Sequence, residues 1–223
     1  MLKCMQGVIP PEELDSIMEL IAACTFADGK RTAGHRARQV KNNLQLDWSS
    51  KHRRALNDRI NAALDNHAEF QAFTLARYIA EPLISCYEPG MAYGEHVDDA
   101  LLGKPDPVRS DLAVTVFLSD PETYDGGELY IGTSYGEIAV KLPRGDAVAY
   151  AANMIHKVAP VTRGRRLAAV TWVQSYVRDP AQREIFGDLR RVKRKLNELC
   201  PELEETRLAD KTYSNLLRMW AEA

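Results

Sequence analysis

The sequence predicts a mainly β protein with flanking α-helices, built around a sandwich or jelly roll of short strands. Between residues 76 and 178, short segments rich in Val, Ile, Thr and Tyr alternate with turns that contain Gly, Pro and Asp. Helical periodicity is found only before and after this stretch. Because no helices separate the strands, a sandwich or jelly roll is favoured. At 223 residues the chain is long enough for one fairly large core.

Residues 1–75 are expected to form a helical region that packs on this core. An amphipathic helix follows the prolines of "IPPEEL", because apolar side chains recur there at helical spacing: Leu14, Ile17, Met18 and Ile21. A second helix is expected in "SSKHRRALNDRINAALDN", with Ser49 or Ser50 as its cap. The basic segment between the two helices, which includes Lys41, is predicted as a solvated hairpin rather than a patch for an anionic partner.

The jelly-roll core is assigned to residues 76–178. Its strands are expected in the segments "PLISCYE", "DLAVTVFLS", "ELYIG", "GEIAVKL", "DAVAYAA", "MIHKV" and "RLAAVTWVQSYV". The segments between them, such as "EPG", "TSYG" and "LPRGD", carry the turn-forming residues. "YDGGEL" is interpreted as a hairpin turn that needs glycine, and no chemistry is assigned to it.

Residues 179–223 are predicted to form a C-terminal helical cap. Apolar side chains recur there in two stripes that Pro201 separates: Ile185, Leu189, Val192, Leu196 and Leu199, then Tyr213, Leu216, Leu217 and Trp220. These stripes are expected to pack on the sheet or against another subunit, so a homodimer is a possible assembly.

Composition and charge exclude several classes of protein. A formal net charge of -2 argues against a nucleic-acid binder. No apolar run approaches the roughly 20 residues that span a bilayer, and the N-terminus lacks a signal peptide, so we expect no membrane partner and a cytoplasmic location. The four cysteines are widely separated, which favours reduced thiols over a disulfide framework or a zinc knuckle.

The segment "YGEHVDD" carries a candidate metal site. His96 and Asp98 are two residues apart, so in an extended strand their side chains project to the same side. Taken alone, this pattern is also typical of a solvated acidic turn. His156 is the only other histidine of the strand-rich region, and it would complete a set of two imidazoles and one carboxylate. Such a set suits a non-haem Fe(II) oxygenase, and a catalytic zinc site could use the same donors.

Arg166 favours iron over zinc. It follows His156 by ten residues, after a "VTRG" turn. From that place a guanidinium can hold the far carboxylate of a dicarboxylate, such as 2-oxoglutarate, that chelates the metal with its other end. The alternative is that Arg165 and Arg166 only keep a turn soluble.

Three segments together resemble a known family: "CYEPGMAYGEHVDD", "DLAVTVFLSDPETYDGGELYI" and "HKVAPVTRGRRLAAVTWVQS". They are similar to the iron(II)/2-oxoglutarate-dependent dioxygenases of the prolyl 4-hydroxylase-like type, and most of all to the PKHD-type (PiuC-like) hydroxylases. The resemblance covers nearly the whole chain and implies a double-stranded β-helix core. It also implies that His96, Asp98 and His156 bind Fe(II), and that Arg166 and Tyr87 hold 2-oxoglutarate.

The resemblance further implies an activity. The expected reaction is hydroxylation of a C–H bond, with release of succinate and CO2 and with L-ascorbate as the reductant. The substrate is left open among an amino acid, a peptidyl proline or lysine, and a siderophore-like molecule. Tyr93, where relatives often have phenylalanine, and Asn43 are expected in the substrate pocket. A zinc-dependent hydrolase and a non-catalytic iron or 2-oxoglutarate sensor stay open as alternatives.

Overall fold

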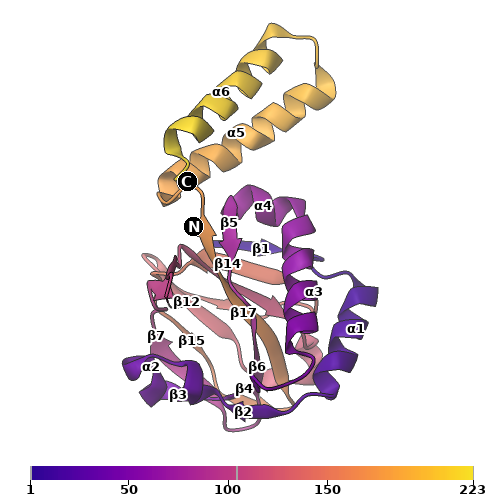
Figure 1. Ribbon diagram of the computed structural model, residues 1–223, viewed down its shortest axis with the longest axis vertical. Coiled ribbons are helices and arrows are strands. Elements are labelled where there is room, and N and C mark those ends of the chain that lie inside the picture. The colour runs from indigo at the N-terminus through magenta and orange to yellow at the C-terminus, as the bar shows by residue number, and fades with distance from the viewer. Residues whose placement is uncertain (1, 104, 223) are drawn as a thin grey trace.

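The computed structural model describes residues 2–103 and 105–222, and it shows two β-sheets flanked by helices (Figure 1). The larger, eight-stranded sheet has the order β1-β14-β10-β17-β6-β4-β2, with β5 paired beside β17. The five-stranded sheet has the order β13-β12-β15-β7-β3. Neighbouring strands are antiparallel throughout both sheets. The predicted fold class, mainly β with flanking helices, is confirmed.

Most strands of the two sheets are short. The larger sheet contains β1 (Leu2–Met5), β2 (Phe26–Asp28), β4 (Leu44–Leu46), β5 (Ala76–Ile79), β6 (Leu83–Tyr87), β10 (Leu112–Phe117), β14 (Ala147–Ala151) and β17 (Arg166–Ser175). The smaller sheet contains β3 (Lys41–Asn42), β7 (Ala92–His96), β12 (Leu129–Thr133), β13 (Gly136–Val140) and β15 (His156–Val158). Two short pairs lie apart from them: β8 (Leu101–Leu102) with β9 (Val108–Arg109), and β11 (Asp125–Gly126) with β16 (Val161–Arg163).

The larger sheet is buried on both faces, and β10 illustrates how. Alternate side chains of a strand point to opposite faces. Val114 and Val116 pack in the cluster that contains the helices, whereas Ala113 and Phe117 pack in the cluster shared with the smaller sheet. This explains why "LAVTVF" is apolar in nearly every position. The space between the two sheets is where polar side chains of both can meet.

Three helices cover the outer face of the larger sheet: α1 (Pro11–Ala22), α3 (Arg53–Asn66) and α4 (Ala68–Thr74). The apolar face predicted for the first helix is confirmed, since Leu14, Ile17 and Ile21 are buried. The predicted serine cap of the second helix is wrong. His52 is the N-cap of α3, whereas Ser49 binds the carboxylate of Asp47 one turn earlier.

The segment between the first two long helices contains more structure than the expected hairpin. Strands β2 and β4 pair as a hairpin would, but the 3-10 helix η1 (Gly29–Thr32), the helix α2 (His35–Val40) and the strand β3 are inserted between them. α2 packs against β7, where a Cβ on Gly94 would come within 2.8 Å of Val40. Residues 1–75 therefore supply strands to both sheets in addition to helices.

The C-terminal helices form a hairpin that extends away from the sheets (Figure 1). α5 (Pro180–Leu199) packs against α6 (Glu204–Trp220) and, at its start, against α4. Phe186 holds the hairpin together through edge-on contacts with Tyr213 and Trp220. The stripe predicted to pack on the sheet or a second subunit does not cover the sheet, because Ile185, Val192 and Leu199 are exposed.

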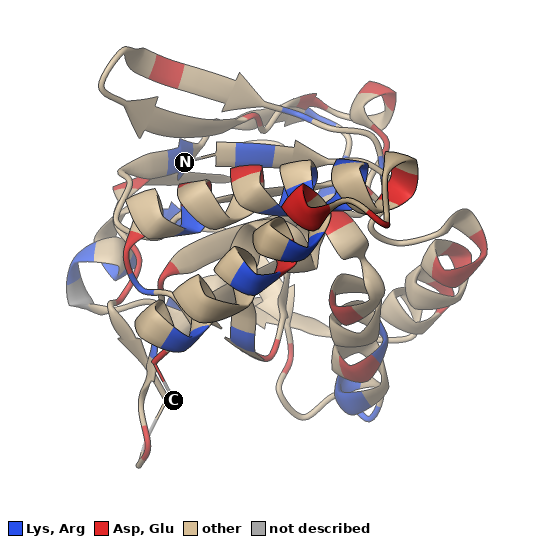
Figure 2. Cartoon of the chain, turned by 90° about the horizontal axis from the view of Figure 1, so that it is seen from above, with Lys and Arg blue, Asp and Glu red and all other residues tan. Residues whose placement is uncertain are grey.

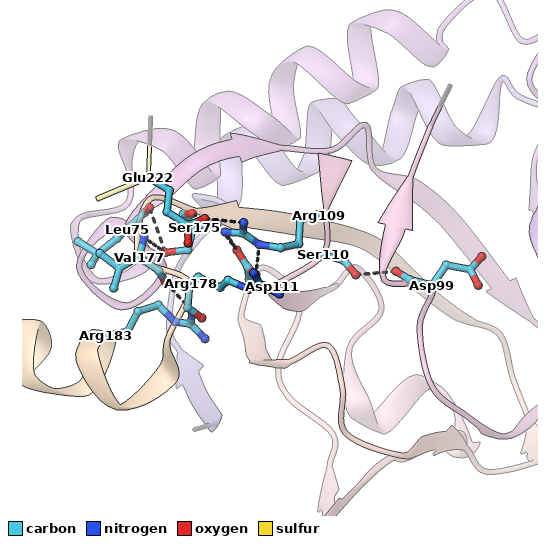
Figure 3. Close-up of polar contacts among 10 residues, drawn as sticks. All are labelled: Leu75, Asp99, Arg109, Ser110, Asp111, Ser175, Val177, Arg178, Arg183 and Glu222. Atoms are coloured by element: carbon cyan, nitrogen blue, oxygen red, sulfur yellow. Dashed lines mark hydrogen bonds and ion pairs between the residues drawn. The ribbon is translucent and has the colours of Figure 1, made fainter. Parts of the chain in front are cut away.

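A polar network attaches this hairpin to the core (Figure 3). Arg109 donates two hydrogen bonds to Asp111, at 2.7 and 3.0 Å, and one to Glu222 at 2.6 Å. Asp111 also accepts from the backbone N–H of Ser175, at the end of β17. At the start of α5, the Arg183 guanidinium donates to two backbone carbonyls. Both ends of the hairpin are thus fixed near the C-terminal end of β17, in the middle of the larger sheet.

Acidic and basic residues are interspersed along the helices, with no large region of one sign in the view of Figure 2. This distribution agrees with the formal net charge of -2. Within residues 2–103 and 105–222, no helix is long and apolar enough to cross a membrane.

Candidate metal centre

Strand pairing brings His96, Asp98 and His156 together between the sheets. β7 and β15 are neighbours in the smaller sheet, and His96 is the direct partner of His156 in their register. Their rings lie 4.2 Å apart, and Asp98 Oδ1 is 3.7 Å from His156 Nε2. One ligand atom from each of the three residues lies within 4.8 Å of the others. The geometry is that of a site that could hold one metal ion.

The backbone fixes which nitrogen of each imidazole is free. Nδ1 of His96 lies 2.8 Å from the carbonyl oxygen of Gly94, and Nδ1 of His156 lies 3.0 Å from that of Met154. A carbonyl only accepts, so both Nδ1 atoms carry the proton and donate. The Nε2 lone pairs are then left for the shared site, as in protein metal centres generally.

The electrostatics of the three residues fit a cation. Burial, reinforced by His156, lowers the pKa of His96 to about 3, so its imidazole is neutral near pH 7. Burial raises the pKa of Asp98, and its Oδ2 atom has no hydrogen-bond partner. A buried carboxylate oxygen without a partner is costly unless a cation binds it. The two neutral imidazoles and the unpartnered carboxylate oxygen are therefore suitable ligands for Fe(II).

Two tyrosines fix the orientation of the histidine rings. Tyr93 stacks on His96, with centroids 3.6 Å apart and planes 15° apart. Tyr150, from β14 of the larger sheet, meets His156 edge-on at 5.2 Å. Burial raises the pKa of both tyrosines, which keeps their hydroxyls neutral. Both side chains line the cavity of about 110 Å³ that contains the three candidate ligands.

Arg166 enters the same cavity from the larger sheet. Its side chain is 1% exposed, and its guanidinium lies 5.2 Å from the ring of Tyr87 and 5.5 Å from that of Phe117. Its Nε has no hydrogen-bond partner, and no carboxylate in the described parts of the chain forms an ion pair with it. A buried guanidinium of this kind fits an anionic ligand. Arg165 points elsewhere, toward Cys86 and Phe26.

Of the other predicted site residues, Tyr87 and Tyr93 line the cavity and Asn43 does not. Tyr87 is the direct partner of Arg166 in the register of β6 and β17, and it lines the cavity. Burial raises its pKa to about 12, although the Arg166 charge opposes this. Tyr93 also lines the cavity. Asn43 is not among the lining residues; its buried carboxamide lies against Gly29 and next to the lining residue Tyr87.

Sequence reasoning missed two features beside Arg166. Tyr124 is buried with a hydroxyl that has no hydrogen-bond partner, and the Arg166 charge opposes the rise in its pKa that burial causes. Gly127, at φ +67°, passes so close that a Cβ would lie 2.9 Å from Arg166 Cδ. The hairpin turn predicted at "YDGGEL" is wrong, because Asp125–Gly126 form β11 and pair with β16; the segment also forms part of the wall around the guanidinium. Only the pairing of distant strands reveals this second role.

The cavity also contains a cation that the sequence placed in solvent. Lys41 was expected in a solvated hairpin, and that prediction is wrong, because the side chain is 5% exposed and lines the cavity. Burial lowers its pKa to about 8. Its Nζ donates to Thr32 Oγ1 at 3.0 Å. Nothing in the sequence of this charge-rich segment distinguishes Lys41, which is buried, from its solvent-exposed neighbours.

Residues 82–174 match the model of the 2OG-Fe(II) oxygenase superfamily. A PKHD-type hydroxylase of Synechococcus sp. (strain JA-2-3B'a(2-13)) is 48% identical over 223 residues and covers 100% of both chains. The chain belongs to the PKHD-type hydroxylases. A second member, from Maricaulis maris, is 47% identical over 222 residues and again covers 100% of both chains. The resemblance expected from the sequence is confirmed, and the protein is a 2-oxoglutarate-dependent dioxygenase.

The fold agrees with this family. A prolyl hydroxylase from Trichoplax adhaerens, solved in complex with a hypoxia inducible factor peptide fragment, superimposes with a TM-score of 0.57. The match covers 77% of this chain and 82% of that one, at 12% sequence identity. Such a likeness concerns the fold alone. Membership of the family implies Fe(II) and 2-oxoglutarate, and it does not favour a zinc hydrolase.

Proposed function

We propose that this protein hydroxylates a C–H bond of a small-molecule or peptidyl substrate, using Fe(II) bound by His96, Asp98 and His156. In the same proposal Arg166, assisted by Tyr87, binds the distal carboxylate of 2-oxoglutarate. One observation carries it: a guanidinium that is 1% exposed, with an unpartnered Nε, shares a cavity with two imidazoles and a carboxylate. The cationic and metal-binding groups thus match the two ends of the cosubstrate.

When bound, Fe(II) and 2-oxoglutarate supply an oxidation in which O2 and 2-oxoglutarate yield succinate and CO2 and one oxygen atom enters the substrate C–H bond. The protein's residues perform the remaining tasks. His96 and His156 present neutral Nε2 atoms, because their Nδ1 atoms donate to backbone carbonyls. Tyr93 and Tyr150 hold the two rings in place and exclude water from them. Arg166 fixes the cosubstrate's orientation through parallel hydrogen bonds.

Uncoupled turnover tests the proposal without knowledge of the substrate. The chain, supplied with Fe(II), O2 and 2-oxoglutarate, is expected to release succinate slowly, and the His156→Ala variant is expected to release none. Replacing Fe(II) with Zn(II) serves as the control for the hydrolase alternative. A wild-type chain that binds 2-oxoglutarate anaerobically but never forms succinate would instead support the sensor alternative. Succinate is measured by mass spectrometry, so the readout does not depend on a coupled enzyme.

Several finer parts of the proposal come from the sequence and the family. L-ascorbate is proposed as the reductant that keeps the metal in the Fe(II) state, and its omission is expected to shorten the time over which succinate accumulates. A cytoplasmic location stays a prediction. The loop that follows Asp98 is proposed to influence substrate choice; its residue Lys104 lies outside the described residues.

A further inference from the structure

Lys41 is a buried cation that the cosubstrate and the metal leave unused. Its side chain is 5% exposed, and it lines the cavity that contains the candidate metal ligands and Arg166. Its Nζ donates to Thr32 Oγ1 at 3.0 Å and lies 5.1 Å from the centroid of the Tyr93 ring. No carboxylate of residues 2–103 or 105–222 lies within ion-pair distance of it. An ammonium buried without a counter-ion lowers stability, so its place calls for a functional reason.

A chain of polar side chains holds Lys41 in position. Thr32 Oγ1 donates to Gln45 Oε1 at 2.5 Å, with the carbonyl oxygen of Gly29 as a second acceptor in reach. Gln45 Nε2 in turn donates to Ser85 Oγ at 3.4 Å. A hydroxyl has one proton, so Thr32 turns a lone pair to Lys41 whichever acceptor it uses. The ammonium has three donors, and Thr32 takes one of them. The others are available to a ligand in the cavity.

The two cations of the cavity come from opposite sheets. Arg166 is on β17 of the larger sheet, whereas Lys41 is on β3 at the edge of the smaller one. Lys41 is paired with Tyr93 in the register of β3 and β7, and the Tyr93 ring stacks on His96. The Tyr93 ring thus contacts both the Lys41 side chain and the metal ligand His96. Lys41 therefore lies beside the candidate metal centre, on the sheet opposite the one that carries Arg166.

The formal charges in the cavity do not balance when only Fe(II) and 2-oxoglutarate are bound. Fe(II) with Asp98 carries a net charge of +1, and Arg166 adds another. 2-Oxoglutarate, with two carboxylates, balances both. Lys41 then leaves one positive charge in a buried place, and the carboxylate of Asp99, which also lines the cavity, is exposed to solvent at its rim. One further carboxylate would neutralise Lys41.

We propose that Lys41 binds a carboxylate of the substrate, which is therefore a small molecule with a free carboxylate. This inference rests on the proposed function and narrows its substrate class. One ammonium beside one hydroxyl suits a singly charged carboxylate, whereas a phosphate usually recruits several donors at once. An acid group bound at Lys41 would leave the rest of the molecule inside the cavity that contains the candidate metal ligands.

Pairs of acids and amides test the proposal. Anaerobic calorimetry on the chain loaded with Fe(II) and 2-oxoglutarate would measure the affinities of the common L-amino acids and of their carboxamides. At least one acid is expected to bind about 10- to 100-fold more tightly than its amide, the range of a charge-assisted hydrogen bond. The preference is expected to vanish in Lys41→Met and to persist in part in Lys41→Arg. Lys30→Met is the matched control, because Lys30 is exposed and is not a lining residue.

The outcomes separate this proposal from the one on which it rests. A wild-type chain that releases succinate yet prefers no acid over its amide would overturn the role of Lys41 and leave the oxygenase activity intact. A preference for the acid over its amide that persists in Lys41→Met would likewise overturn the role of Lys41. If Lys41→Met instead weakened 2-oxoglutarate binding as much as Arg166→Ala, Lys41 would belong to the cosubstrate site. A wild type that fails to bind 2-oxoglutarate at all would remove both proposals.

Discussion

His96 and His156 face each other across the antiparallel pair of β7 and β15, with ring centroids 4.2 Å apart. This strand pairing explains how two histidines 60 positions apart in the sequence can bind one ion. Asp98 joins them from the segment just after β7, where one of its carboxylate oxygens lies within 4.8 Å of a ligand atom of each histidine. The site therefore depends on one local spacing and one long-range strand contact.

Each of the three candidate ligands is expected to be essential. His96→Ala, Asp98→Ala and His156→Ala should each reduce Fe(II)-dependent succinate formation by at least about 100-fold, since even the residues that only support metal ligands affect affinity by 10- to 100-fold. Glu95→Ala is the matched control, because this exposed carboxylate pairs with Lys157. Bound iron, measured by metal analysis, should fall in the three variants alone. Normal iron content in any of them would remove that residue from the site.

Arg166 is expected to control the affinity for 2-oxoglutarate. Loss of one charge-assisted interaction typically costs about 2–3 kcal/mol, so Arg166→Ala should weaken cosubstrate binding about 30- to 150-fold, with Arg166→Lys intermediate. Arg165→Ala should change it little, because Arg165 contacts Cys86 and Phe26 outside the cavity. Anaerobic titration of the Fe(II)-loaded chain provides the measurement. Equal affinities for wild type and Arg166→Ala would contradict the assignment.

Lys41 is expected to lower the stability of the chain without ligands. Its pKa falls from 10.5 to about 8 on folding, so below pH 8 the folded state bears the cost of a buried charge. Lys41→Met should therefore raise the free energy of unfolding by about 3 kcal/mol at neutral pH. The gain should shrink as pH rises from 8 to 10.5, because the wild-type lysine is then neutral in the folded state. Urea denaturation across this range, with Lys30→Met as control, measures the effect; a pH-independent gain would contradict it.

Asp111 is expected to stabilise the attachment of the C-terminal hairpin. It accepts two hydrogen bonds from Arg109 and one from the backbone of Ser175, and its side chain is only 7% exposed. Asp111→Ala would leave Arg109 without its buried partner, at a cost of about 3–5 kcal/mol. Glu222→Ala should cost no more than about 1 kcal/mol, because that carboxylate is 47% exposed. Equal losses of urea stability in the two variants would disprove this ranking.

The homodimer expected from the sequence stays a prediction, and α5 offers a place to test it. Ile185, Val192 and Leu199 are spaced seven residues apart and are 49%, 53% and 66% exposed. Such a row lies on one face of a helix, as in helices that pair. Val192→Glu should convert a dimer into a monomer while leaving uncoupled succinate release unchanged. Light scattering after gel filtration gives the mass, and a monomeric wild type would end this hypothesis.

The sequence by itself determined the fold class and the three candidate metal ligands. The spacing of His96 and Asp98 predicted side chains on one side of an extended backbone, and their ligand atoms do lie together, although β7 ends at His96. Periodicity also identified the first helix and the terminal pair, since an amphipathic face appears in the sequence wherever a helix buries one side. His156 was indicated as the only other histidine of the strand-rich region and Arg166 by its place ten residues later, and the family resemblance then implied the same roles.

Only the tertiary structure decided what surrounds that site. Lys41 belongs to a charge-rich segment, and it is buried because β3 pairs with β7 at Tyr93. Tyr124 lies beside Arg166 only because the following strand β11 pairs with β16, and Asn43 is buried against Gly29 outside the cavity lining. Contacts of this kind join residues far apart in the chain, and their burial depends on sheet pairing rather than local spacing. A single sequence records the side chains that make such contacts but not the strand register that brings them together.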